Sequence, residues 1–283
     1  MSPHRLLVLQ SAGPNDVAWR SAIHHRAVEL GWTYQEYWGG DPVSYSNSGP
    51  GVLLTSDFDQ AERFGAGAVV VLADAPDQIA ETYDHRLSLN GQGRVPASEW
   101  LANAITLVKE GAPVYAAWEA GHEFPGLGTV AVDAAVMRIG PADTSSSLAT
   151  YADLASGCVQ KVVWPVSLLT TPEGLPAPDG PIPLMGRRRH LLVGPYLFFP
   201  AGRFRLTLDF VVDAERLAPS LRFEWGLTDD VAAHEQIINA SGRYRLEIVH
   251  SWERPSAVAL KIMVERATFG GWLSCGPCLI TPL

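Results

Sequence analysis

The sequence predicts two unlike domains. The first is a three-layer α/β domain on a parallel sheet, and the second is an antiparallel, jelly-roll-like β-sandwich. Three observations lead to this prediction. The chain opens with an apolar strand, a helix and a second strand, which is the order typical of a parallel sheet. Residues 171–186 contain five prolines. Beyond them, apolar and polar residues alternate, as they do in half-buried antiparallel strands.

The Pro-rich segment sets the expected domain boundary, because proline removes backbone donors and is excluded from helix interiors and central strands. We expect a Rossmann-like α/β domain at residues 1–170, a linker at 171–186 and a β-sandwich domain at 187–283. A chain of 283 residues is long enough for two domains that each bury a core.

In the first half, apolar runs and helix boundaries place the elements. Residues 5–10 form a continuous apolar run, which is typical of a strand buried on both faces. Gly31 ends the helix that begins near Asn15. We expect strands near residues 5–10, 33–38, 52–55, 68–72, 114–118 and 129–136, and helices near residues 15–30, 57–64, 75–85, 98–109 and 148–155.

In the second half, strict alternation marks the strands. Phe204, Leu206 and Leu208 share one face of a strand, and Arg203 and Arg205 share the other. We expect strands at residues 191–199, 203–210, 221–225, 243–250, 258–266 and 272–280. Short strands at this spacing are typical of a sandwich.

The net charge of −9 is unevenly distributed. Residues 1–160 carry 8 Lys and Arg against 18 Asp and Glu, whereas residues 161–283 carry 13 against 12. The acidic half repels nucleic acid, and we expect no nucleic-acid partner. No apolar run approaches the length of a membrane span, and three cysteines fit a reducing compartment, so we expect a cytoplasmic protein.

The turn after the first strand is a candidate ligand site. Ligands of open parallel sheets bind beyond the carboxyl ends of the strands, where the next helix presents free backbone N–H groups. Ser11, Gly13 and Asn15 occupy that turn. Asp16, at the start of the helix, opposes a phosphate there, so a plain structural turn is the alternative.

Asp57-Phe-Asp59 follows the expected strand at residues 52–55. The string resembles the Asp-x-Asp motif of many glycosyltransferases. The resemblance implies that Asp57 and Asp59 hold a divalent metal on the diphosphate of a nucleotide sugar. The alternative is a pair of solvated carboxylates that cap a helix.

A second polar segment follows the expected strand at residues 114–118. Glu119, His122 and Glu123 carry the groups that general acid–base catalysis uses, and they are the catalytic candidates. No nucleophile at a diagnostic spacing accompanies them, and a polar loop is the alternative.

Cys275-Gly-Pro-Cys278 is identical to the active-site tetrapeptide of thioredoxins. In that family it opens a helix whose N-terminus lowers the thiol pKa. Only Leu279 to Leu283 follow it here, too few residues for such a helix. We therefore favour two structural cysteines in a terminal strand over a redox site.

In the second half, aromatic side chains are candidates for stacking on sugar rings. Trp225 shares a face with Leu221 and Phe223, which predicts a core position. Trp252 lies beside Arg254 in an expected turn, so we expect it to be exposed and name both as candidate ligand contacts.

Residues 194–209 and 241–246 resemble β-sandwich modules attached to bacterial polysaccharide-biosynthesis proteins. The resemblance covers roughly the last 95 residues and implies glycan contact or a scaffolding role. The leading hypothesis is a cytoplasmic protein of surface-polysaccharide assembly. In it the sandwich binds a glycan or a protein partner, and the α/β domain binds a nucleotide or sugar nucleotide.

Two alternatives stay open. One is a glycosyltransferase-like or hydrolytic enzyme that uses Asp57 and Asp59, with a divalent metal, or the segment from Glu119 to Glu123. The other is a structural protein that forms homo-oligomers through its sheet edges and binds no small ligand.

Overall fold

The computed structural model describes residues 5–39, 49–89, 91–138, 146–178, 180–215, 217–227 and 229–283. The chain divides into two compact units. The first comprises Met1–Asp143 and Tyr151–Cys158, and the second comprises Thr144–Thr150 and Val159–Leu283.

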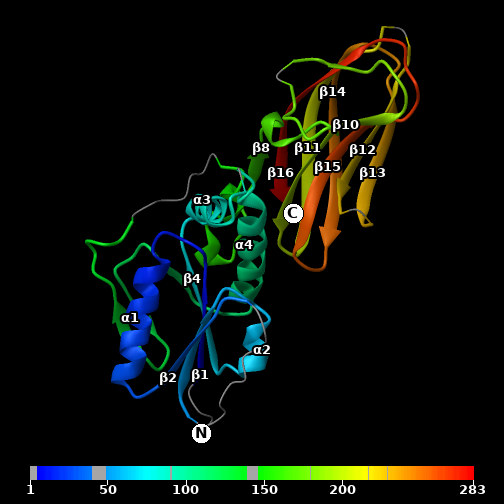
Figure 1. The fold of residues 1–283 in the computed structure, drawn as a ribbon. Coiled ribbons are helices and arrows are strands. Elements are labelled where there is room, and N and C mark those ends of the chain that lie inside the picture. The colour runs from blue at the N-terminus through cyan, green and yellow to red at the C-terminus, as the bar shows by residue number, and fades with distance from the viewer. Residues whose placement is uncertain are drawn as a thin grey trace. The chain divides into compact units, whose positions relative to one another are not determined.

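The first unit contains a parallel sheet of five strands (Figure 1). Its strands are β1 (Arg5–Gln10), β2 (Thr33–Tyr37), β3 (Gly51–Thr55), β4 (Ala68–Ala73) and β5 (Val114–Ala116). Their order is β2-β3-β1-β4-β5, and each neighbouring pair is parallel. The predicted parallel sheet is confirmed. β1 and β4 are neighbours in this sheet. From β1 the chain continues to β2 at one edge of the sheet, and from β4 it continues to β5 at the other edge. A topological switch point therefore lies between the carboxyl ends of β1 and β4.

Helices follow most of these strands, and both faces of the sheet carry apolar clusters. The helices are α1 (Asp16–Glu29), α2 (Gln60–Phe64), α3 (Pro76–Leu87) and α4 (Arg94–Lys109). Trp19 and Ile23 of α1 pack with Val8 on one face. Leu7 clusters with Phe64 of α2 on the other face, because successive residues of β1 point to opposite sides. The finer three-layer description stays a prediction.

Two expected elements of this unit differ from the structure. The strand expected at residues 129–136 is the shorter β7 (Gly128–Ala131), which pairs only with β6 (Gly121–Phe124) in a hairpin. The helix expected at residues 148–155 is two 3₁₀ helices, η1 (Ala149–Tyr151) and η2 (Leu154–Ser156). Asp153 separates them, because its ψ of 49° breaks the helical conformation.

The second unit contains two antiparallel sheets. One has the order β10-β15-β12-β13 and the other β14-β11-β16-β8, with β9 also paired to β16. The strands of this unit are β8 (Val162–Trp164), β9 (Ile182–Pro183), β10 (Arg189–Phe199), β11 (Gly202–Asp213), β12 (Ser220–Gly226), β13 (Val231–Ile237), β14 (Gly242–Trp252), β15 (Ser256–Val264) and β16 (Trp272–Pro282). Figure 1 shows their long strands.

Aromatic side chains join the two sheets across a shared core. The ring centroids of Phe210 and Phe223 lie 5.1 Å apart, and those of Trp225 and Trp252 also lie 5.1 Å apart. Each pair contributes one residue from each sheet, so the sheets face one another as a β-sandwich. Trp225 is fully buried, which confirms its predicted core position.

The domain boundary lies earlier in the structure than the sequence suggests. β8 pairs with β16, so residues from 159 onward belong to the sandwich unit and not to the α/β unit. The Pro-rich segment 171–186 also attaches to the sandwich: β9 lies within it and Leu184 is fully buried. Proline is tolerated there because β9 is a two-residue strand at a sheet edge.

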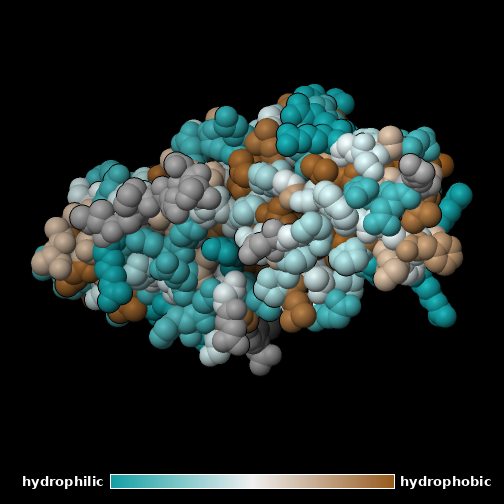
Figure 2. All heavy atoms as spheres, turned by 90° about the horizontal axis from the view of Figure 1, so that it is seen from above, coloured by the Kyte–Doolittle hydropathy of each residue, from teal (hydrophilic) through white to brown (hydrophobic). Residues whose placement is uncertain are grey.

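No helix among the described residues is long and apolar enough to cross a membrane. On the face shown in Figure 2, hydrophobic residues are exposed in small groups between hydrophilic ones. Such mixing is usual for protein surfaces in contact with water.

Candidate functional site

A pocket of about 510 Å³ lies at the carboxyl ends of β4 and β5. Ala73 and Asp74 reach it from the end of β4, and Trp118 and Glu119 reach it from the turn after β5. Residues 151–155, which include part of η2, form another wall. Both its position and its volume are typical of ligand sites in open α/β sheets.

Asp74 is held at the edge of this pocket by the turn after β1. The side-chain amide of Asn15 donates a hydrogen bond of 2.7 Å to Asp74 Oδ1, and the Asp74 backbone N–H donates one of 2.9 Å to Ser11 Oγ. Asn15 also exchanges two hydrogen bonds with the backbone of Arg138. Ser11 and Asn15 are buried, and their side chains join loops of the protein itself; their predicted ligand role stays a prediction.

Burial raises the pKa of Asp74 to about 6, since a charged carboxylate loses hydration in the protein interior. The hydrogen bonds from Asn15 oppose this rise, and the nearby Asp16 adds to it. Gly13 packs directly on the carboxyl group: a Cβ at position 13 would lie 1.7 Å from Asp74 Oδ2. The turn therefore requires glycine at position 13, which gives Gly13 a packing role; its predicted ligand contact stays a prediction.

His122 lies in the pocket wall in a fixed orientation. Its Nε2 donates to the carbonyl oxygen of Ala116 at 2.8 Å, since a carbonyl can only accept. Its ring stacks on Tyr115, with centroids 4.6 Å apart, and on Trp19 at 5.3 Å. Nδ1 is then the nitrogen nearer Glu119, whose Oε2 lies 3.7 Å away.

The three catalytic candidates do not all meet. Glu119 and His122 both line the pocket, whereas Glu123 does not. Glu123 belongs to the β6–β7 hairpin, where its carboxylate accepts a hydrogen bond of 2.7 Å from Thr129 Oγ1. This leaves Glu119 and His122 as the pair that shares a site.

The pocket is acidic and partly aromatic. Asp74, Glu119 and Asp153 contribute carboxyl groups, and Trp118 and Tyr115 contribute rings. None of the described residues that line it is Lys or Arg. A diphosphate would therefore meet like charge there, whereas hydroxyl or ammonium donors would find acceptors.

Asp57 and Asp59 line a different cavity, of about 310 Å³, together with Glu99 and Tyr83. Asp57 Oδ1 accepts the backbone N–H of Asp59 at 2.9 Å, and Oδ2 accepts from the side chain of Gln60 at 2.9 Å. This geometry caps the start of α2. Among the described residues, no group of three or more His, Cys, Asp or Glu is arranged to hold a metal ion, and the metal role of Asp57 and Asp59 stays a prediction.

In the sandwich, the expected exposure of Trp252 is wrong. The residue is only 4% exposed, because its ring packs against those of Phe204 and Trp225 in the core. Its edge still borders an open cavity of about 920 Å³, which the exposed Arg254 also lines. Their ligand contact stays a prediction, with Arg254 the more accessible of the two.

Cys275 and Cys278 lie within the strand β16 and not at the start of a helix. Burial raises the pKa of both thiols to about 12, the opposite of what a redox-active cysteine requires. Both thiols are free.

Sequence reasoning missed Asp74, Trp118 and Tyr151 as lining residues. A signal was present for Asp74, because it directly follows a buried strand that neighbours β1. Tyr151 had no such signal, since it reaches the pocket from a segment distant in sequence.

No family model matches the chain, and no curated protein matches it. Several solved structures that it resembles are carbohydrate-binding modules. TmCBM61 in complex with β-1,4-galactotriose is 12% identical, with a TM-score of 0.27, over 35% of this chain and 67% of that one. A family 16 carbohydrate-binding module is 10% identical, with a TM-score of 0.27, over 38% and 82% of the two chains.

A third similar structure holds the CBM22-1 and GH10 modules of xylanase 10B from Clostridium thermocellum, complexed with xylohexaose. It is 7% identical, with a TM-score of 0.27, and the match covers 44% of this chain but only 24% of the xylanase chain. Similarity at these identities and TM-scores does not establish a shared function.

Proposed function

We propose that this chain is a carbohydrate-binding protein whose α/β unit holds a neutral sugar in the pocket at the ends of β4 and β5. The observation that carries the proposal is the lining of that pocket, which combines the rings of Trp118 and Tyr115 with the carboxyl groups of Asp74, Glu119 and Asp153. The role that we assign to it is that of a cytoplasmic protein of surface-polysaccharide assembly.

Sugars suit this lining for two physical reasons. The electron-rich face of an aromatic ring attracts the partly positive C–H groups on the apolar face of a sugar. A carboxylate accepts hydrogen bonds from hydroxyl groups, and charge-assisted bonds are stronger than neutral ones. Glu119 and Asp153 are exposed, so hydroxyl groups of a ligand can reach them.

A nucleotide sugar is the other ligand that fits the proposal, with its sugar in the pocket and its diphosphate outside it. The three carboxyl groups repel a diphosphate inside the pocket. If Asp57 and Asp59 hold a divalent ion, the charge of the diphosphate would be neutralised there. The lining of the pocket favours the free sugar, because its carboxyl groups repel a diphosphate and the free sugar carries none.

A thermal-shift screen of the full chain tests the proposal. The probes are neutral monosaccharides and disaccharides, and nucleotide sugars with and without Mn²⁺. A ligand at 100 times its Kd stabilises a protein by about 2.7 kcal/mol, which raises its melting temperature by several degrees. We expect neutral sugars to give such a rise and Trp118→Ala to abolish it.

Trp38→Ala is the matched control, since Trp38 is a half-exposed tryptophan of the same unit that does not line the pocket. The proposal fails if no sugar stabilises the wild type, or if both tryptophan variants respond equally. A response to nucleotide sugars only with Mn²⁺, lost in Asp59→Ala, would replace the free sugar with a metal-bound nucleotide sugar.

A second candidate function is hydrolysis or transfer of a glycosidic bond, and the Glu119–His122 pair favours it. The backbone carbonyl of Ala116 fixes the His122 ring so that its other nitrogen is nearer the Glu119 carboxylate. A histidine oriented in this way can take or return a proton. Sugar release from nitrophenyl glycosides or nucleotide sugars by the wild type, and its loss in both Glu119→Gln and His122→Gln, would establish an enzyme.

A further inference from the structure

The outward face of β11 and β14 carries four exposed arginines, Arg203, Arg205, Arg243 and Arg245, which we call the arginine strip. They share one face because side chains alternate along a strand, and the intervening residues such as Phe204 and Leu246 are buried in the sandwich core. The register pairs Asp209 with Arg245 and Val211 with Arg243, so the two strands form one continuous surface.

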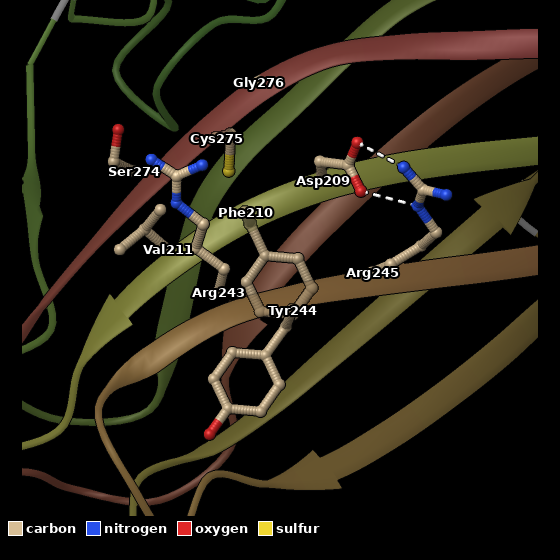
Figure 3. Close-up of a pocket in the computed structure, with 9 residues that line it drawn as sticks. All are labelled: Asp209, Phe210, Val211, Arg243, Tyr244, Arg245, Ser274, Cys275 and Gly276. Carbon is tan, nitrogen blue, oxygen red and sulfur yellow. Dashed lines mark hydrogen bonds and ion pairs between the residues drawn. The ribbon is translucent and has the colours of Figure 1, made fainter.

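A cavity of about 680 Å³ lies at one end of this strip (Figure 3). Val211 of β11 lies between Arg243 of β14 and Ser274 of β16 in the register, and Figure 3 shows the Arg243 side chain extending toward Ser274. No described residue forms an ion pair or hydrogen bond with the Arg243 guanidinium. Five N–H donors are thus presented beside a serine hydroxyl.

Two other arginines of the strip face carboxylates. Arg245 binds Asp209 through two hydrogen bonds, of 2.7 and 2.9 Å, which the dashed lines in Figure 3 mark. Arg205 lies 3.9 Å from Glu247, too far for a strong pair. Arg203, like Arg243, has no described ion-pair partner. The strip therefore has an excess of positive charge on a chain whose net charge is −9.

The spacing of these charges selects among anionic ligands. At about 3.4 Å per residue, Arg203 and Arg205 stand roughly 7 Å apart, and the strip from Arg203 to the level of Arg243 is roughly 27 Å long. Duplex DNA carries one charge in about every 1.7 Å, far more than four arginines can neutralise. The strip suits a chain whose charges are several ångströms apart. Asp209 and Glu247 would also repel dense phosphate but accept hydroxyl groups.

We propose that the arginine strip binds an acidic polysaccharide that carries a carboxylate on its repeating unit. Arg243 and Arg203 hold carboxylates of the ligand, and Asp209 and Glu247 accept hydrogen bonds from its hydroxyl groups. Guanidinium and carboxylate match in geometry and form paired hydrogen bonds. This site extends the proposed carbohydrate function to a second surface, and it does not depend on whether the α/β pocket takes a sugar.

Binding of polygalacturonate oligosaccharides to the full chain, measured by titration calorimetry at low salt, tests this site. The matched ligand is the same oligosaccharide with its carboxyl groups methyl-esterified, which removes the charge and keeps the sugar. We expect the acid form to bind and the ester to bind at least tenfold more weakly. Arg243→Gln should weaken binding of the acid form by about two- to fivefold, since one solvent-exposed ion pair is lost.

Arg188→Gln is the control variant, because Arg188 is also exposed and lies outside the strip, just before β10. Arg188 pairs with Glu265 at 3.0 Å, and its substitution removes the same charge elsewhere on the sandwich. Arg203→Gln provides a second test at the other end of the strip. The proposal is overturned if acid and ester bind equally, if Arg188→Gln weakens binding as much as Arg243→Gln, or if duplex DNA binds as tightly as the polygalacturonate. Loss of binding in Trp118→Ala would also contradict it, whereas failure of the α/β pocket to bind any sugar would not.

Discussion

The side-chain amide of Asn15 donates a hydrogen bond of 2.7 Å to Oδ1 of Asp74, and this bond ties the turn after β1 to the end of β4. The two residues lie on opposite sides of the switch point. The bond therefore links the carboxyl ends of the neighbouring strands β1 and β4 beside the proposed sugar pocket. A buried carboxyl group kept in place by one amide is expected to be sensitive to pH and to packing.

Asp74→Asn tests the pH sensitivity. The pKa of Asp74 is about 6 in the folded chain against 3.8 ordinarily, so the folded state binds more protons between these values. The Asp74 carboxyl group therefore contributes fully to the free energy of unfolding below about pH 4. This contribution is lost as the pH rises through 6, and the free energy of unfolding then falls by an amount on the order of 3 kcal/mol. Asparagine does not titrate, so the Asp74→Asn variant does not lose this contribution. The difference in free energy of unfolding between variant and wild type should therefore shift in favour of the variant from about pH 4.5 to about pH 7.5, two values that bracket the transition.

Urea unfolding of both proteins at the two pH values measures this gain. Taking the difference between variant and wild type removes the contribution of carboxyl groups common to both, such as Asp209, whose pKa is lowered by its hydrogen bonds to Arg245. An unchanged difference between acid and neutral pH would show that Asp74 is ionised normally.

Gly13→Ala should destabilise the α/β unit. The added methyl group would stand 1.7 Å from Asp74 Oδ2, which is buried and cannot move freely. Overpacking of this kind typically costs about 1–3 kcal/mol. Gly180→Ala is the control, because a Cβ there meets nothing within 4 Å. Equal melting temperatures for the two variants would mean that the turn can shift away from Asp74.

The thiols should divide into one reactive and two unreactive groups. Cys158 is exposed, whereas burial raises the pKa of Cys275 and Cys278 to about 12 and leaves almost no thiolate at neutral pH. Labelling with a thiol reagent at pH 7.5, a value chosen about 4.5 units below those pKa values, should therefore modify one cysteine of the native chain and three after denaturation. Rapid labelling of Cys275 in the native chain would revive a redox role.

Trp252→Ala should lower the stability of the chain, whether or not Trp252 contacts a ligand. Removal of a buried tryptophan costs about 3–5 kcal/mol, and Trp252 is 4% exposed within an aromatic cluster. Phe269→Ala is the control, since Phe269 is 85% exposed. A Trp252→Ala chain that melts like the control but loses glycan binding would restore the sequence-based interpretation of an exposed stacking residue.

Periodicity predicted the strands that carry an unambiguous pattern. The continuous apolar run of β1 and the strict alternation of β11 appear in the structure with nearly the expected bounds. β13 was missed because it lies at a sheet edge with exposed residues such as His234 and Glu235, so it shows no apolar face. β8 is three residues long and owes its conformation to pairing with β16, which no local pattern reveals.

The candidate site was only partly accessible to sequence reasoning. Glu119 and His122 were found because polar groups follow a strand end, and that rule places them in the pocket. Trp252 was misjudged because its neighbours Glu253 and Arg254 are polar, while the ring itself turns into the core. The alternation along the sequence predicted that the arginines of each strand share one face. That Arg203 and Arg243 have no described ion-pair partner could be read only once the register of β11 with β14 was known.

Saturation-transfer difference NMR on the full chain, with a mixture of neutral monosaccharides and disaccharides, is the sharpest test of the proposed sugar site. We expect transfer to the C–H protons of at least one sugar with the wild type and with Trp38→Ala, and none with Trp118→Ala. Absence of transfer to every sugar with the wild type, or equal transfer with Trp118→Ala, would contradict a sugar site in the pocket at the ends of β4 and β5.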